Sequence, residues 1–161
     1  MSFQGHMYRM AMLAMTMEPV ASVDMSKVVR MCLVHDLAET RVGDITPYDG
    51  VSAEDKHQRE TQAMASIAGF LRPEAGKELT TLFQEYEEHA SPEAKLTKDL
   101  DLFDMIQQAF EYEKQSQKSG TLVPDLEEFF THTERICNPQ VRSWCQQLLL
   151  ERRATRESQP N

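Results

Sequence analysis

The chain has 161 residues, a formal net charge of −9 and three cysteines, a combination that excludes several classes of protein. A chain of this length can bury its own core, so we expect one domain over residues 1–153 and a polar tail over 154–161. The negative charge disfavours binding to a nucleic-acid polymer, because such binding relies on Lys and Arg neutralising phosphates. No apolar stretch approaches the roughly 20 residues of a membrane span, and three cysteines without a CxxC pair are typical of reduced thiols. We therefore expect a cytoplasmic or, alternatively, a nuclear protein that binds neither membranes nor nucleic-acid polymers.

Apolar side chains recur at helical spacing along most of the chain, which predicts an all-α bundle of about six to seven helices. In chain order, helices are expected over residues 4–17, from Ser22 or Asp24 to at least His35, and over 53–71, 73–89, 92–114, 125–136 and 139–153, with a loop over 40–51 and a turn over 120–124. The first helix carries a methionine-rich stripe that we interpret as core. The second is apolar almost all round near its end, which is typical of a central, buried helix.

An unbalanced group of acids closes this second helix, in the stretch VHDLAETRVGD at residues 34–44. On a continuing helix, His35 and Glu39 would share one face, and Asp36 would be rotated by about 100° from His35. His6, at the start of the first helix, and Asp101, on the flank of a later apolar stripe, can supply further ligands. Two imidazoles and two carboxylates suit a borderline divalent ion such as Mn, Co, Fe, Ni or Zn.

Spacing alone leaves plainer interpretations open. A histidine on an apolar face is most often a hydrogen-bonded core residue. Asp99, Asp101 and Asp104 on one helix are typical of a solvated acidic face. Arg41, in the glycine-containing loop RVGD, can contact a phosphate or can simply be solvated, and the sequence favours neither.

A rival metal-binding pattern occurs in the next helix, where Glu54, His57 and Glu60 include the Glu-x-x-His spacing of di-iron bundles. Such bundles need a second Glu-x-x-His, which the sequence lacks, so a solvated helix face is the better interpretation. Nucleophile elbows and phosphate-cradling glycine loops are also absent from the sequence. Covalent catalysis therefore has little support.

The ordered set His6, His35-Asp36 and Asp101 resembles the H…HD…D signature of the HD-domain metal-dependent phosphohydrolases. The local sequence is similar to the 5′-deoxynucleotidase branch of that family over about residues 6–150. The segments that carry this similarity are HMYRMA (6–11), LVHDLAE (33–39), VGDI (42–45), EDKH (54–57) and the AK…KxxD pattern that ends at residue 101.

This resemblance implies an all-α enzyme that removes the 5′-phosphate from deoxyribonucleoside monophosphates as a homodimer. It implies one divalent metal ion, for which Mn, Co, Mg, Fe, Ni and Zn are candidates. The residues that match the family's metal ligands are His6, His35, Asp36 and Asp101. Those that match its catalytic carboxylates, which activate water and protonate the leaving 5′-oxygen, are Glu39 and Asp44. Which of these two carboxylates does which job stays open, and Arg41 is a candidate for substrate binding.

Two departures from the family pattern keep other functions open. Relatives carry an acidic residue just before the first His, where this chain has SFQG at residues 2–5. They also place a helix and an Arg/Trp-bearing loop that helps hold the nucleotide ahead of this point, and we expect this domain to lack both. The alternatives are a catalytically weak metal- or nucleotide-binding scaffold and an HD phosphohydrolase for another nucleotide. An apolar face on Trp144, Leu148 and Leu149 is interpreted as core, with a dimer surface as the alternative.

Overall fold

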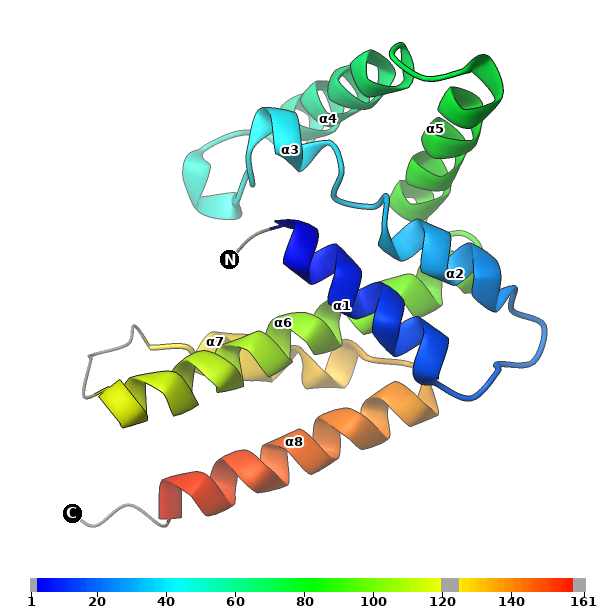
Figure 1. Cartoon of the computed structure of the whole chain (residues 1–161). Coiled ribbons are helices and arrows are strands. Elements are labelled where there is room, and N and C mark those ends of the chain that lie inside the picture. Colours follow the sequence, from blue (N-terminus) through cyan, green and yellow to red (C-terminus); the bar gives the residue numbers. More distant parts are fainter. Residues whose placement is uncertain (1–2, 120–124, 158–161) are drawn as a thin grey trace. The chain divides into compact units, whose positions relative to one another are not determined.

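The computed structural model describes residues 3–119 and 125–157, and all regular structure within these residues is helical, which confirms the all-α prediction (Figure 1). The elements are α1 (Phe3–Thr16), α2 (Met25–Cys32), α3 (Glu39–Val42), η1 (Pro47–Asp49), α4 (Ala53–Ala68), α5 (Pro73–Glu88), α6 (Pro92–Ser119), α7 (Glu127–Thr131), η2 (His132–Arg135) and α8 (Pro139–Glu157). The predicted turn over 120–124 lies outside the described residues. None of the described helices is long and apolar enough to span a membrane.

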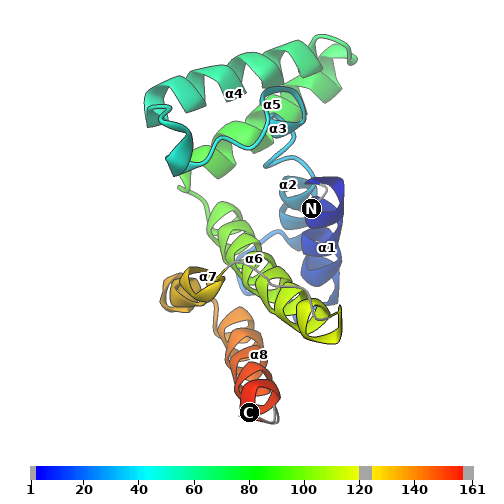
Figure 2. The same cartoon turned by 90° about the vertical axis from the view of Figure 1, so that its left-hand side faces the viewer.

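The chain divides into two compact units, Met1–Thr97 and Lys98–Asn161. In the first unit, α1 packs against α2 and α4 lies beside α5, as Figure 2 shows. The methionine stripe of α1 is core, as predicted: Met7, Met10 and Met17 are all buried.

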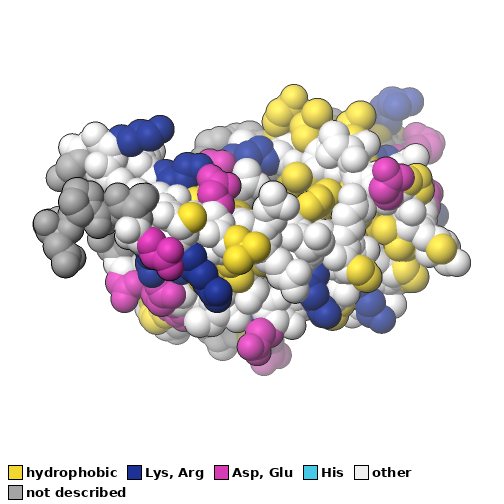
Figure 3. Space-filling model, turned by 90° about the horizontal axis from the view of Figure 1, so that it is seen from below, with side chains coloured by type: hydrophobic (Ala, Val, Ile, Leu, Met, Phe, Trp, Pro, Cys, Tyr) yellow, Lys and Arg dark blue, Asp and Glu magenta, His cyan; other side chains and the backbone are white. Residues whose placement is uncertain are grey.

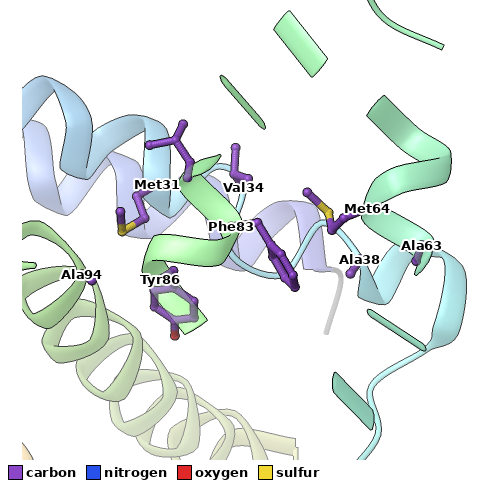
Figure 4. Close-up of a cluster of buried hydrophobic side chains, with 9 residues drawn as sticks. Met31, Val34, Ala38, Ala63, Met64, Phe83, Tyr86 and Ala94 are labelled. Carbon is purple, nitrogen blue, oxygen red and sulfur yellow. The ribbon is translucent and has the colours of Figure 1, made fainter. Parts of the chain in front are cut away.

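A hydrophobic cluster joins the end of α2 to α4 and α5 (Figure 4). Its buried members are Met31, Val34, Ala38, Ala63, Met64, Leu82, Phe83, Tyr86 and Ala94. Residues on both sides of the His35-Asp36 pair therefore point into one core. Burial of this apolar surface fixes the backbone on which the candidate site is built.

Gly76 of α5 is buried and lies close to Ala68, the last residue of α4. A Cβ atom built at Gly76 would lie 2.8 Å from the carbonyl oxygen of Ala68. Because backbone atoms cannot easily move aside, a residue without a side chain is required at this crossing.

In the second unit, two acids expected on a solvated face are buried instead: Asp99 is 5% exposed and Asp104 is fully buried. The Asp99 carboxylate accepts hydrogen bonds from the backbone N–H groups of Cys137, at 3.0 Å, and Asn138, at 2.6 Å. These bonds tie α6 to the start of α8. The solvated interpretation is therefore wrong for these two acids. The partners of Asp99 lie far along the chain, so the sequence around this acid does not reveal them.

Arg152 of α8 is also buried, with its guanidinium 3.4 Å from the ring centroid of Phe130. It pairs with Glu113 at 2.7 Å and with Glu127 at 2.7 Å. These ion pairs lower the pKa of both carboxyl groups, although burial of Glu113 opposes the effect there. On the face seen in Figure 3, Lys and Arg side chains lie among Asp and Glu side chains rather than in one basic patch.

Several element ends differ from the prediction. Helix α2 stops at Cys32, before His35, and α6 and α8 run on to Ser119 and Glu157. The helix expected over 125–136 is divided into α7 and η2, and the loop expected over 40–51 contains the end of α3 and all of η1. In the apolar face of α8, Leu148 is buried, and the Trp144 ring lies 5.7 Å from that of Phe103, which favours core packing there.

Candidate metal centre and its flanking acids

The backbone leaves the helical path directly after α2. The N–H groups of Val34, Leu37 and Glu39 donate to carbonyls three residues earlier, at 3.0 Å in each case, so residues 33–38 form a series of tight turns. The expectation that His35 and Glu39 share the face of one continuous helix is wrong. Nδ1 of the His35 ring lies 3.0 Å from the carbonyl oxygen of Cys32, the last residue of α2, and a side chain can satisfy a carbonyl at the end of a helix in this way.

These turns bring two elements of the first unit together around one carboxylate. Asp36 Oδ2 lies 3.3 Å from His35 Nε2 and 3.5 Å from His6 Nε2, which comes from the first turns of α1. The two imidazole rings are 5.3 Å apart and meet edge to face. His6 is 8% exposed and His35 is 3% exposed, so these nitrogens face each other in the interior. Three of the four predicted ligands thus form one cluster within the described residues.

The hydrogen bond of His35 determines which ring nitrogen is free for a metal. Its Nδ1 lies 3.0 Å from the Cys32 carbonyl, and since a carbonyl only accepts, Nδ1 must carry the proton. In the neutral ring Nε2 then presents a lone pair, and this buried atom has no hydrogen-bond partner among the described residues. The Tyr86 ring, 5.0 Å away, packs edge-on against the His35 ring and limits its rotation. An oriented imidazole with a buried, unpaired Nε2 is what a metal ligand needs.

Glu39 and Asp44 flank this cluster on the same stretch of chain. Burial first, and then the nearby charges of Asp36 and Asp44, raise the pKa of Glu39 to about 8, while Lys56 opposes the shift. Asp44 is exposed and follows Gly43, which takes a φ of +78° at the end of α3. Glu39 therefore lies within the electrostatic reach of both Asp36 and Asp44.

Asp101 and Arg41 are not part of this cluster as described. Asp101 belongs to the second compact unit, where its carboxylate accepts a hydrogen bond from Lys98 Nζ at 2.7 Å, and its role as a ligand stays a prediction. Arg41 is exposed, with its guanidinium 5.4 Å from the ring centroid of Phe70. Its predicted contact with substrate also stays a prediction.

The rival Glu-x-x-His face is solvated only in part. Glu54 and His57 are exposed, with His57 Nδ1 lying 3.4 Å from a carboxylate oxygen of Glu87, but Glu60 is only 6% exposed. The solvated interpretation is therefore wrong for Glu60. Its ammonium partner, Lys56 at 3.6 Å, also went unnoticed in the sequence, although Lys and Glu four residues apart on a helix are a recognisable pair.

All regular structure in the described residues is helical, and two buried histidines lie beside one carboxylate. The protein therefore belongs to the class of helical proteins with a candidate metal centre. Residues 1–144 match the family model described as "HD domain". The chain belongs to the HD domain family.

Named relatives agree with this assignment. The chain is 46% identical over 152 residues to "5′-deoxynucleotidase HDDC2" of Danio rerio, a match that covers 94% of this chain and 74% of the relative. It is 41% identical to the protein of the same name from Dictyostelium discoideum, covering 94% of this chain and 84% of that one. Among solved structures, a "predicted metal-dependent phosphohydrolase" from Magnetospirillum magnetotacticum has a TM-score of 0.70 at 26% identity, covering 93% of this chain and 78% of the other.

Proposed function

We infer that this chain is a metal-dependent 5′-deoxynucleotidase, which hydrolyses deoxyribonucleoside 5′-monophosphates to the deoxyribonucleoside and phosphate. The observation that carries the proposal is the buried Nε2 of His35, which has no hydrogen-bond partner within residues 3–119 and 125–157 and lies 3.3 Å from the Asp36 carboxylate, beside a second imidazole. The names of relatives such as those from Danio rerio and Dictyostelium discoideum supply the substrate class.

The donor set fits a borderline divalent ion. We propose His6, His35 and Asp36 as ligands, with Asp101 as the fourth on the strength of the sequence signature alone. Nitrogen and carboxylate donors suit Mn, Co, Fe, Ni or Zn, and Mg is the harder alternative. When bound, the ion would polarise a phosphate oxygen and acidify a water, which makes hydrolysis feasible near neutral pH without a covalent intermediate.

The chain's own contribution is orientation and proton handling. The Cys32 carbonyl and the Tyr86 ring hold the His35 imidazole in one tautomer and one orientation. Glu39 and Asp44 are proposed to share the proton transfers: one orients and deprotonates the attacking water, and the other protonates the leaving 5′-oxygen. Both groups come from one short stretch of chain after Asp36, and Glu39 lies within the electrostatic reach of Asp36.

The assembly and substrate contacts are proposed from family resemblance. We propose a homodimer, which light scattering of the purified chain tests directly. Arg41 is proposed to contact the substrate phosphate, because a guanidinium offers planar, paired donors.

The test of the function is phosphate release from a panel of deoxy- and ribonucleoside 5′-monophosphates with Co or Mn. We expect turnover of the deoxy substrates, and a loss of at least about 100-fold in kcat for Glu39→Gln, the magnitude typical of a lost general acid or base. Glu88→Gln, an exposed acid at the end of α5, is the matched control and should behave like wild type. Metal binding without release from any nucleotide would contradict the enzyme and favour a binding scaffold, and release only from another nucleotide class would favour a different phosphohydrolase.

Metal content tests the ligand set separately. His35→Ala should lose the bound ion in elemental analysis, whereas His57→Ala, an exposed histidine of the rival pattern, should keep it. Unchanged metal content in His35→Ala would show that this assignment of the ligands is wrong.

A further inference from the structure

Lys56 joins two parts of the first unit next to the candidate site. It lies near the start of α4, and its Nζ donates a hydrogen bond to the carbonyl oxygen of Ile45 at 3.0 Å. The same ammonium lies 3.6 Å from Oε1 of Glu60, one turn further along α4. A single charged group therefore contacts the loop after α3 and the body of α4.

Ile45 is the residue directly after Asp44. Its side chain is buried, whereas Asp44 is exposed, so the backbone is anchored immediately beyond the proposed catalytic carboxylate. Further along, the loop closes on itself, since Asp49 accepts hydrogen bonds from the N–H and the hydroxyl of Thr46, both at 2.7 Å. These hydrogen bonds order the turn within the loop, and the hydrogen bond from Lys56 attaches the loop to α4.

The Glu60 carboxylate holds the Lys56 ammonium beside the Ile45 carbonyl. The Glu60 side chain is 8% exposed and that of Lys56 is 36% exposed, so the pair lies at the edge of the interior. A buried carboxylate needs a charged or hydrogen-bonding partner, and Lys56 is the cation that opposes the raised pKa of Glu60. Since a long lysine side chain loses rotamer freedom when fixed, a buried counter-charge is a reason for it to remain ordered.

We propose that Lys56, held by Glu60, is a positioning residue that fixes the Asp44-bearing segment against α4. This inference rests on the proposed function for its activity measurement only; the exchange measurement on Lys56 does not depend on it. Lys56 acts through the backbone of Ile45. Asp44 keeps a defined place relative to the His35-Asp36 centre because both flanking segments are attached to the same packed unit.

Hydrogen–deuterium exchange measures the anchoring without any reference to activity. In Lys56→Met, amides of residues 43–51 should exchange roughly tenfold faster, about the effect of losing one net hydrogen bond. Lys56→Arg retains a cationic donor and should recover slow exchange, and Arg59→Met removes an exposed cation of the same helix and should change nothing. Unchanged exchange over this segment in Lys56→Met would overturn the proposal, whether or not the chain is an enzyme.

Steady-state kinetics with a deoxyribonucleoside monophosphate and Mn measures the consequence. Lys56→Met should lower kcat by about 10- to 100-fold, the cost typical of a small misplacement, with KM within about threefold and substantial rescue in Lys56→Arg. Unchanged kcat alongside faster exchange would also overturn the positioning role. If the wild-type chain turns over no nucleotide, the proposed function fails, and exchange alone decides whether Lys56 anchors the loop.

Discussion

Glu39 should destabilise the metal-free protein as pH rises, and Glu39→Gln should abolish this effect. Burial first, and then the charges of Asp36 and Asp44, raise the pKa of Glu39 from its ordinary value of 4.5 to about 8. A carboxyl group whose pKa is raised on folding prefers the protonated form in the folded state. Its contribution to stability is complete below its unfolded pKa and is lost as pH rises through the folded pKa, so the relevant window runs from about 4.5 to 8.

The magnitude follows from the size of this shift. At about 1.4 kcal/mol for each pKa unit, the full shift would correspond to roughly 5 kcal/mol. Glu39 is only partly buried, so solvent screening reduces the expected loss of unfolding free energy between pH 5 and pH 8 to about 1–3 kcal/mol. Glutamine has nearly the same shape and no titration, and Glu39→Gln should therefore be the more stable protein at pH 8.

The assay is urea unfolding in EDTA at several pH values between 5 and 8, for wild type and Glu39→Gln in parallel. The difference in unfolding free energy between the two proteins cancels the titration of all other groups, provided that these are little affected by the substitution. We expect this difference to grow with pH in favour of the variant, and excess Mn to diminish it by supplying a positive charge. A difference that stays constant from pH 5 to pH 8 would refute the reasoning, because Glu39 would then titrate alike in the folded and unfolded chain.

Two further substitutions test the packing, one in each compact unit. Gly76→Ala should destabilise the protein by about 1–3 kcal/mol, because the added Cβ meets the Ala68 carbonyl and overpacking costs about this much; Gly69→Ala, whose Cβ would make only ordinary contacts, should be nearly neutral by thermal unfolding. Arg152→Met should cost about 3 kcal/mol, because it leaves the Glu113 carboxylate, 14% exposed, without its buried partner. Its exposed neighbour provides the control Arg153→Met, and equal melting temperatures for these two variants would contradict a stabilising role for the buried pair.

Helix starts were predictable from sequence because their signals are local. Asp24 caps α2 by accepting from the Lys27 N–H at 3.1 Å, and Ser52 caps α4 by accepting from the Asp55 N–H at 3.0 Å. In both cases, the cap and the N–H that it accepts from are three residues apart, so the sequence contains the whole interaction. The three residues of the central cluster were also predicted, from the order of the motif and its family resemblance.

The burial of Asp99 could not be predicted in this way. Its partners, the N–H groups of Cys137 and Asn138, lie 38 and 39 residues further along the chain. A local pattern contains only the acid and its helical neighbours, and an acid with no visible partner is reasonably placed in solvent. Glu60 was misplaced although Lys56 is close in sequence, because Glu and Lys at this spacing are also common on exposed helix surfaces.

The error at the end of α2 bears most directly on function. A continuing helix and a series of tight turns can both direct Met31, Val34 and Ala38 inward, so the apolar pattern does not distinguish them. They differ in the path of the backbone after Cys32, the last residue of α2. Here the ring of His35 donates to the Cys32 carbonyl at 3.0 Å. That bond occupies Nδ1 and leaves Nε2 beside Asp36, so the candidate metal centre is oriented by the ending of the helix and not by its face.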